Sequence, residues 1–375
     1  MKRRTLGLIG VVAHLIAAGV PAAWLLTTKT AAQSPQAQAR SVPVFEVDPA
    51  WPKLPPQFKL GDASSFAIDA QDNVWLLHRP RTLKPEDTVK AAPPIVVFDA
   101  AGNFIKAWGG EASGYEWPQR EHGIHIDHKG YVWLGGNNCP ENNAPTKPVT
   151  DDQLLKFTQD GKFVLQIGRS NQTKGNADTV NLHRPADAWV LPKTNELFVA
   201  DGYGNRRVVV FDADTGKFKR MWGAFGGKPT DDPSCAVRSR KDFSDGQGPD
   251  QFNVAHAIRV ASDGMVYLAD RENRRVQMFT SDGKFVKQLL VTNMAFARDL
   301  ALSPDAAQQF LYVGAGQGIM IVDRRTMEAL GMIAVPGQLG PGHHIAADSK
   351  GNIYIAQTAA GLQKLVFKGM APAGQ

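Results

Sequence analysis

Four short apolar segments, separated by tight-turn residues, recur as a unit along the chain, and this repetition leaves few folds open. In the clearest copy, residues 254–290, Asp-Gly turns join the first two segments and the last two. Similar units cover residues 64–108, 121–168, 185–222 and, more weakly, 298–333. Apolar segments of about six residues between such turns are typical of antiparallel β-strands. We therefore expect an all-β protein built from four-stranded antiparallel units.

The last unit is incomplete, and a segment near the N-terminus supplies what it lacks. Residues 343–367 contain only three strand-like segments, whereas residues 42–47, VPVFEV, alternate like a fourth strand. The repeat region has no helical period, which favours a β-propeller over a solenoid. Six units predict a six-bladed β-propeller closed by the N-terminal strand, because that pairing removes exposed strand edges.

Residues 1–39 have the pattern of an export leader. The basic residues 2–4 precede an apolar stretch at residues 6–26, and the Ala-Gln-Ala sequence at residues 37–39 offers a cleavage site. The apolar stretch is longer than the usual core of about 7–15 residues, so an uncleaved anchor is the alternative. We expect residues 40–375 to form a single propeller domain that is exported, periplasmic or secreted, and meets a membrane only if the leader is retained.

The charge balance and the cysteine count exclude several functions. Four of the 42 Lys and Arg residues lie in residues 1–39, which contain no acid, so the rest of the chain nearly balances its 36 Asp and Glu residues. A nucleic-acid partner is not expected, because binding nucleic acid requires clustered basic residues. Two cysteines cannot build a cysteine-based zinc site. We expect a monomer that acts on a small molecule or a peptide C-terminus.

Three histidines occupy a matched position in alternate units. The residue eight positions before the glycine of the first turn is His122, His256 or His343 in these units. In the other three units the same position falls near residues 65, 187 and 298. A single histidine lining a channel is more often bonded to water, but three at one depth favour a metal ion. Three imidazoles from separate strands suit an open zinc site, which keeps a fourth position for water or substrate.

Several phrases of the sequence resemble a known enzyme family. ADGYGNRRVVVF and ADRENRRVQMF resemble NHL repeats, and IGRSNQ, RPADAWV, ADGYGN, GPDQFNVAHAI and ADREN follow one another as in the peptidylglycine α-amidating lyases. LLHR, EHGIHID and GHHIAAD extend the resemblance over roughly residues 60–368. The resemblance implies NHL-type blades, a Zn²⁺ ion in the central channel, and cleavage of a C-terminal α-hydroxyglycine to a peptide amide and glyoxylate.

The resemblance also assigns roles to three residues outside the histidine set. It places the catalytic tyrosine at Tyr203 and the two substrate-binding arginines at Arg79 and Arg271. Blade topology agrees with this assignment. Each of the three residues ends or follows the second strand of its unit, and the loop after that strand opens on the same face as the start of the first strand. Tyr203 would act as general base, its phenolate form favoured by nearby positive charge. The arginines would pair with the substrate carboxylate. We interpret Asp201 and Asp270 as turn-capping residues.

Two positions depart from the family. A carboxylate follows the third zinc histidine in the family and helps to hold a structural calcium ion, whereas this chain has His344, a poor calcium ligand. The sequence therefore argues against calcium. Gly204 replaces a cysteine that forms a disulfide in the family. Cys139 and Cys235 lie in segments expected to open on the active face, where an exported protein could join them or leave them apart.

Three functions are compatible with this pattern. We favour the zinc-dependent carbon–nitrogen lyase, whose true substrate stays open because nothing in the chain would make an α-hydroxyglycine. A metal-dependent lactonase or esterase on the same channel is less favoured, because such propellers usually bind metal through carboxylates and Asn. A ligand- or protein-binding NHL propeller without chemistry is the third possibility. The long loops at residues 137–150 and 223–251 are the expected determinants of substrate selection.

Overall fold

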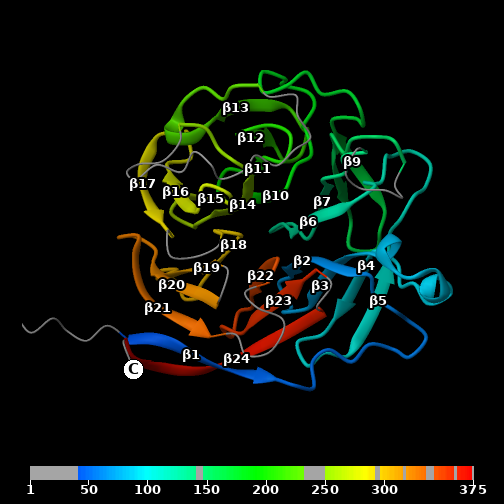
Figure 1. Ribbon diagram of the computed structural model, residues 1–375, viewed down its shortest axis with the longest axis horizontal. Coiled ribbons are helices and arrows are strands. Elements are labelled where there is room, and N and C mark those ends of the chain that lie inside the picture. The colour runs from blue at the N-terminus through cyan, green and yellow to red at the C-terminus, as the bar shows by residue number, and fades with distance from the viewer. Residues whose placement is uncertain are drawn as a thin grey trace, which may run out of the picture. The chain divides into compact units, whose positions relative to one another are not determined.

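The computed structural model describes residues 41–140, 147–231, 250–291, 296–315, 318–334, 342–358 and 361–373. Six separate four-stranded sheets surround a common centre (Figure 1). In five of them the strands follow one another in chain order from the centre outward, and every neighbouring pair is antiparallel. The predicted all-β, six-bladed propeller of antiparallel blades is confirmed.

The blades are numbered here in chain order from the first complete sheet. Blade 1 contains β2 (Asp62–Ile68), β3 (Val74–Arg79), β4 (Ile95–Phe98) and β5 (Phe104–Trp108). Blade 2 contains β6 (Glu121–Ile126), β7 (Val132–Gly136), β8 (Leu154–Phe157) and β9 (Phe163–Ile167). Blade 3 contains β10 (Asp187–Leu191), β11 (Glu196–Asp201), β12 (Arg207–Asp212) and β13 (Phe218–Trp222).

The remaining blades complete the ring. Blade 4 contains β14 (Ala255–Val260), β15 (Val266–Asp270), β16 (Arg275–Phe279) and β17 (Phe285–Leu290). Blade 5 contains β18 (Asp299–Leu302), β19 (Phe310–Gly314), β20 (Gly318–Asp323) and β21 (Glu328–Ala334). Blade 6 contains β22 (His344–Ala347), β23 (Ile353–Gln357) and β24 (Gly361–Pro372). Three short 3₁₀ turns lie in the connections, η1 (Pro80–Thr82), η2 (Pro85–Lys90) and η3 (Ala224–Gly226).

The N-terminal strand closes the ring, as the sequence predicts. β1 (Ser41–Asp48) is the outermost strand of blade 6 and pairs antiparallel with β24, with Phe45 opposite Phe367 and Val47 opposite Leu365. Because the first and last strands of the described chain share one sheet, blade 6 has its full set of four strands. The ring is thereby held together by main-chain hydrogen bonds between distant parts of the chain.

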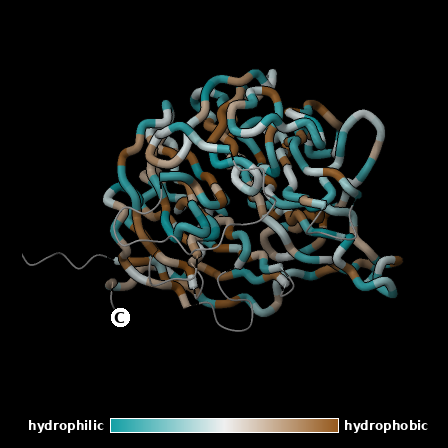
Figure 2. The backbone as a smooth tube through the Cα atoms, turned by 45° about the horizontal axis from the view of Figure 1, so that its top comes forward, coloured by the Kyte–Doolittle hydropathy of each residue, from teal (hydrophilic) through white to brown (hydrophobic). Residues whose placement is uncertain are grey.

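The hydrophobic core is divided among the contacts between adjacent blades. Six clusters of buried apolar side chains are present, and each combines residues of two neighbouring blades. Figure 2 shows hydrophobic and hydrophilic stretches alternating along the chain. The described residues include no helix with the length and hydropathy that a bilayer crossing requires. The apolar faces of the strands therefore hold the blades side by side and leave polar residues for the centre of the ring.

The turn after the first strand repeats one set of contacts. The carboxylate of Asp69 caps its own turn and accepts a hydrogen bond of 2.9 Å from the Trp75 indole. Asp127 binds Trp133 in the same way at 2.9 Å. These indoles are almost fully buried, and an unpaired indole N–H there would be costly. The recurring aspartate of the turn therefore fixes both the hairpin and the aromatic side chain of the second strand.

Candidate metal centre

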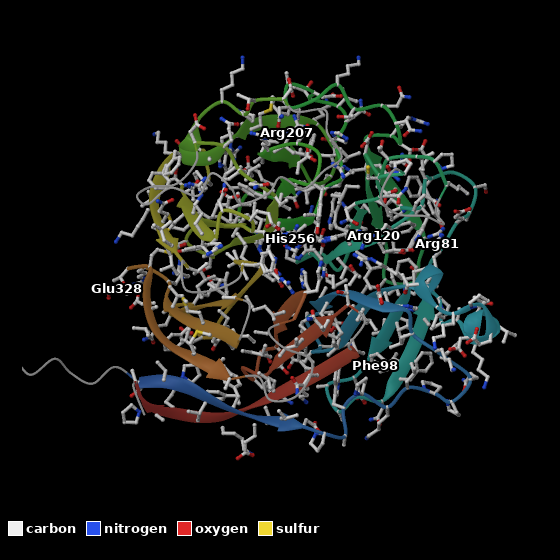
Figure 3. The ribbon with its side chains drawn as sticks, viewed as in Figure 1. Arg81, Phe98, Arg120, Arg207, His256 and Glu328 are labelled. Atoms are coloured by element: carbon white, nitrogen blue, oxygen red, sulfur yellow. The ribbon has the colours of Figure 1, made fainter. Side chains whose placement is uncertain are left out.

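The three histidines predicted from the repeat lie together at the centre of the ring. His122 is in β6, His256 is in β14, and His343 immediately precedes β22. The distances between their ring centroids are 4.8, 4.9 and 5.3 Å. One nitrogen from each ring lies within 4.8 Å of the other two. His256 lies near the middle of the ring in Figure 3.

Each imidazole is oriented by a backbone carbonyl of the next blade. Nδ1 of His122 lies 2.7 Å from the carbonyl oxygen of Ala186, and Nδ1 of His256 lies 2.6 Å from that of Arg298. Nδ1 of His343 lies 2.8 Å from the carbonyl oxygen of Ser64. A carbonyl can only accept, so each Nδ1 carries the proton and each Nε2 offers its lone pair. This tautomer leaves Nε2 of each ring free to bind a metal ion, and the residues therefore fit an open three-histidine zinc site.

The surroundings keep these rings neutral. Burial, followed by the influence of the other histidines, holds the pKa of His122 well below its ordinary value. Burial, followed by the charge of Arg271, does the same for His256. Burial and then the charge of Arg79 lower the pKa of His343 to about 3. Only a neutral imidazole binds a metal ion, so the depressed pKa values favour the binding-competent form.

Tyr203 joins this group from the loop after β11. Its hydroxyl oxygen lies 3.0 Å from Nε2 of His122 and 3.1 Å from Nε2 of His256. Nη1 of Arg271 donates a hydrogen bond of 2.8 Å to the same oxygen. The phenol oxygen therefore lies between two of the prospective metal-binding nitrogens and a guanidinium.

The two predicted arginines differ in their surroundings. Arg79 ends β3, is buried, and donates from Nε to the carbonyl oxygen of Glu121 at 2.8 Å and from Nη2 to Ser64 Oγ at 3.1 Å. Burial and then the charge of Arg120 lower the pKa of Arg79 to about 10, so Arg79 is cationic at neutral pH. Arg271, in contrast, binds the Tyr203 hydroxyl and forms an ion pair of 2.9 Å with Glu272. Arg271 is thus held between the Tyr203 hydroxyl and the Glu272 carboxylate.

Repeat architecture explains why these loops hold their shape. The buried carboxylate of Asp201 accepts hydrogen bonds from the His183 backbone at 2.9 Å, Asn205 at 2.8 Å and Arg207 at 2.9 Å. Asp270 makes the equivalent contacts in blade 4, the loop of which carries Arg271. The recurring Asp, Asn and Arg residues therefore have a structural role.

Gly204 is required by close packing beside the tyrosine. A Cβ atom at this position would lie 2.2 Å from the ring of His183. The backbone N–H of Gly204 also donates a 3.0 Å hydrogen bond to the His183 carbonyl oxygen. The loop that presents Tyr203 is thus packed directly against the chain that precedes blade 3.

A second polar cluster, which the sequence did not reveal as a unit, lies in the channel. Asp187, Asp299 and His344 bring one ligand atom each within 4.8 Å of one another, and all three are buried. Arg259 forms ion pairs with both carboxylates. Calcium takes about six to eight oxygen ligands. A histidine and two carboxylates already paired with a guanidinium do not fit such a site.

The cysteines and the long loops are only partly described. Cys139 follows β7, is buried and is not a free thiol. Cys235 lies outside the described residues, so its pairing with Cys139 stays a prediction. The two loops expected to select the substrate include residues 141–146 and 232–249, which also lie outside the described residues.

Comparison with known proteins agrees with the resemblance seen in the sequence. The chain is 26% identical over 343 residues to peptidyl-glycine alpha-amidating monooxygenase B of Xenopus laevis, covering 84% of this chain and 35% of the relative. It is 24% identical over 242 residues to a probable peptidyl-alpha-hydroxyglycine alpha-amidating lyase of Caenorhabditis elegans, covering 60% of this chain and 57% of the relative. NHL repeat-containing protein 3 of Mus musculus is 24% identical over 246 residues, covering 64% of this chain and 58% of the relative.

These relatives define the class as an NHL-type propeller similar to the amidating lyases. The chain spans about a third of the length of the Xenopus relatives it matches. No family model matches the chain. Among solved structures, a streptogramin B lyase matches with a TM-score of 0.53 and 12% identity, covering 86% of this chain and 98% of that one, which supports the fold alone.

Proposed function

We propose that the protein is a zinc-dependent lyase that cleaves the carbon–nitrogen bond of an N-acyl-α-hydroxyglycine, giving an amide and glyoxylate. One observation carries the proposal: Nε2 of His122 and His256 and the guanidinium of Arg271 all lie within hydrogen-bonding distance of the Tyr203 hydroxyl oxygen. His343 would supply the third nitrogen of the zinc site. The substrate would be a small molecule or the C-terminus of a peptide.

The chemistry assigns a separate task to each side chain. Zinc, when bound, would polarise the substrate oxygen that it binds and lower its pKa. Tyr203, as the phenolate, would take the proton of the α-hydroxyl group while the carbon–nitrogen bond breaks. The hydroxyl oxygen then forms the aldehyde of glyoxylate, and the bonding electrons leave with the amide nitrogen. The nitrogen takes up one proton, which Tyr203 can return, so that atoms and charge balance.

The arginines would hold the substrate in place for this step. Arg79 is a buried cation whose backbone and serine contacts fix the guanidinium plane beside the histidines. It would pair with the substrate carboxylate, because guanidinium and carboxylate groups match in geometry. Arg271 would stabilise the phenolate of Tyr203 through its 2.8 Å contact and add positive charge near the carboxylate.

The alternatives explain fewer of these contacts. A lactonase or esterase would not need a tyrosine hydroxyl held by two histidines and an arginine. A non-catalytic NHL propeller would need neither that hydroxyl nor the matched Nδ1 contacts. The export that we propose rests on residues 1–39, which lie outside the described residues.

The decisive experiment measures metal content and product together. Purified protein without the leader should contain about one zinc ion per chain and release glyoxylate from N-acyl-α-hydroxyglycines. His256→Ala should lose both zinc and turnover, whereas His128→Gln, which changes an exposed histidine of blade 2, should keep both. Protein that stays metal-free when zinc is supplied would contradict the lyase. Zinc-loaded protein that leaves these substrates intact but hydrolyses lactones or esters would favour the alternative enzyme.

A further inference from the structure

Blades 1, 3 and 5 bind the flanking histidine blades in the same way. At the beginning of the innermost strand, a backbone carbonyl accepts the Nδ1–H of the histidine in the preceding blade. The side chain of the next residue accepts the backbone N–H two residues after the histidine of the following blade. These side-chain acceptors are Ser65, Asp187 and Asp299, which bind the N–H groups of Ile124, Ile258 and Ile345. Each odd-numbered blade is thus a bridge between two histidine-bearing strands.

Two of these three bridges are joined by one side chain. Arg259 lies on β14, three residues after His256, and is 5% exposed. Its Nη1 donates to Asp187 Oδ2, and its Nη2 lies 3.4 Å from Asp299 Oδ1. The guanidinium therefore connects the carboxylates of blades 3 and 5 across blade 4.

The connection has a direct consequence for the histidines. The residue before Asp187 is Ala186, whose carbonyl oxygen binds His122, and the residue before Asp299 is Arg298, whose carbonyl oxygen binds His256. A displacement of either carboxylate would move the adjoining carbonyl and turn the imidazole that depends on it. The third bridge uses Ser65, a neutral side chain in place of a carboxylate, and its preceding carbonyl, that of Ser64, binds His343.

Removing the guanidinium would change the state of both carboxylates. Asp187 and Asp299 are almost fully buried, and a buried charge without a partner is strongly unfavourable. Burial raises the pKa of Asp299 to about 8, and Arg259 opposes this shift. Without Arg259 these groups would have to take up protons or move toward water. Either response alters the hydrogen bonds to Ile258 and Ile345.

We propose that Arg259 is a positioning residue of the metal centre, which fixes the rings of His122 and His256 through Asp187 and Asp299. This role rests on the proposed function in that the Nε2 atoms of these histidines are taken as zinc ligands. The hydrogen bonds of Arg259 go to Asp187, Asp299 and the Ile258 carbonyl oxygen rather than to either imidazole. Its effect reaches them through the two carboxylates and the adjoining carbonyl groups. His343 keeps its own carbonyl contact with Ser64 and is linked to the carboxylates only through the backbone of Ile345 and the neighbouring His344, so its Nδ1–H signal is expected to respond less.

The test compares two buried arginines in the full chain. Arg259→Met removes the guanidinium from the channel, and Arg259→Lys keeps one positive charge. Arg324→Met is the control, because Arg324 is likewise buried (1% exposed) and paired with a carboxylate, that of Asp263. Arg324 lies in the turn after β20, and its partners lie on the side of blades 4 and 5 where the first and second strands are joined. If Arg259→Met does not fold, the lysine variant decides the question.

Two measurements separate positioning from general destabilisation. In metal-free protein, imidazole ¹⁵N–¹H spectra, assigned with single histidine variants, should show shifted Nδ1–H signals for His122 and His256 in Arg259→Met and smaller changes for His343. Zinc affinity, measured by competition with a chelator, should fall about 10- to 100-fold, the usual effect of losing a residue that orients metal ligands. Arg259→Lys should recover part of both properties, and Arg324→Met should alter neither.

Two outcomes would overturn the assignment. The first is that Arg259→Met keeps wild-type imidazole signals and wild-type zinc affinity. The second is that Arg324→Met changes them to the same extent, which would make the effect one of stability alone. If wild-type protein binds zinc but releases no glyoxylate, the proposed lyase fails while the role of Arg259 stands. If wild-type protein binds no zinc, the spectra still report whether Arg259 sets the orientation of the two rings.

Discussion

The hydroxyl oxygen of Tyr203 lies 3.0 Å from Nε2 of His122, although 81 residues separate the two in the chain. The nitrogen belongs to the innermost strand of blade 2, and the hydroxyl belongs to a loop of blade 3. Because Nε2 of neither His122 nor His256 carries a proton, the single tyrosine hydroxyl proton can be donated to one of them at a time, and Arg271 donates to the tyrosine oxygen. A group that can lose a proton is thereby held next to the prospective metal ligands.

Replacing Tyr203 with phenylalanine should separate metal binding from turnover. The three Nε2 atoms stay available, so Tyr203→Phe should keep about one zinc ion per chain. Loss of a general base typically lowers turnover by about 10²- to 10⁴-fold, and we expect kcat to fall within that range. Glyoxylate release and elemental analysis on the same sample would check this. Full turnover in the zinc-loaded variant would remove the tyrosine from the mechanism.

The two arginines should differ in their kinetic effects. Arg79→Lys loses the planar guanidinium and should raise KM about 10- to 100-fold, which corresponds to one lost charged hydrogen bond of about 1.5–3 kcal/mol. Arg271→Lys should mainly lower kcat, because Arg271 contacts the Tyr203 hydroxyl. Arg169→Lys is a suitable control, since the side chain of Arg169 is 75% exposed and pairs with Glu116. Equal changes of KM and kcat in both variants would contradict these separate roles.

A methyl group at Gly204 should disturb the tyrosine loop. The added Cβ would lie 2.2 Å from the His183 ring, so Gly204→Ala should destabilise the protein by about 1–3 kcal/mol, as overpacking commonly does, and lower turnover. Urea unfolding and glyoxylate assays would measure both effects. The double variant Gly204→Ala/His183→Ala removes the obstructing ring and should recover part of the loss. A double variant no better than Gly204→Ala would assign the defect to the backbone.

Acid should weaken the fold through buried histidines outside the metal centre. Burial lowers the pKa of His78 to about 4, and its Nδ1 accepts a 3.1 Å hydrogen bond from the Gly61 backbone. Below an unfolded-state pKa of about 6.5 the unfolded chain binds a proton that folded His78 excludes, so this residue lowers stability as the pH falls from about 6.5 toward 4.

A histidine variant isolates this contribution from that of other groups. We expect His78→Gln to cost less stability at pH 5.5 than at pH 7.5, by about 1 kcal/mol, since one pKa unit corresponds to about 1.4 kcal/mol. Urea unfolding at both pH values would measure the difference, with His128→Gln as the exposed control. An unchanged cost at the two pH values would mean that His78 accepts a proton without unfolding.

Local sequence signals were sufficient for the architecture, and they also nominated the individual candidate site residues. Turn glycines at regular spacing placed the innermost strands in register, so His122, His256 and His343 could be matched before their contacts were known. The structure brings them together with Tyr203, Arg79 and Arg271, whose roles stay proposals. The first turns of blades 1, 3 and 5 contain no glycine, so the matched positions there, near residues 65, 187 and 298, were approximate. The hydrogen-bonding equivalent of Ser65 in blade 5 is Asp299, one residue beyond the expected position.

The role of Arg259 could not be predicted, because it depends on contacts between blades. An arginine three residues after a histidine on a strand is unremarkable by itself, and its direction depends on carboxylates 72 and 40 residues away in the chain. Side-chain pairs of this kind are set by how the blades are staggered around the axis. The repeat pattern describes each blade separately, so it does not predict how side chains of neighbouring blades meet.

The pairing of β1 with β24 closes the propeller by joining the first and the last described strands in one sheet. This pairing cannot form before β24 has been synthesised, so blade 6 stays incomplete during most of the synthesis of the chain. Until β1 pairs with it, the free edge of β24 is open to any other unpaired strand, including the β1 of another copy. A nick or deletion within residues 41–48 would therefore favour exchange of strands between molecules, even though the candidate metal centre lies at the opposite, inner edge of the blades.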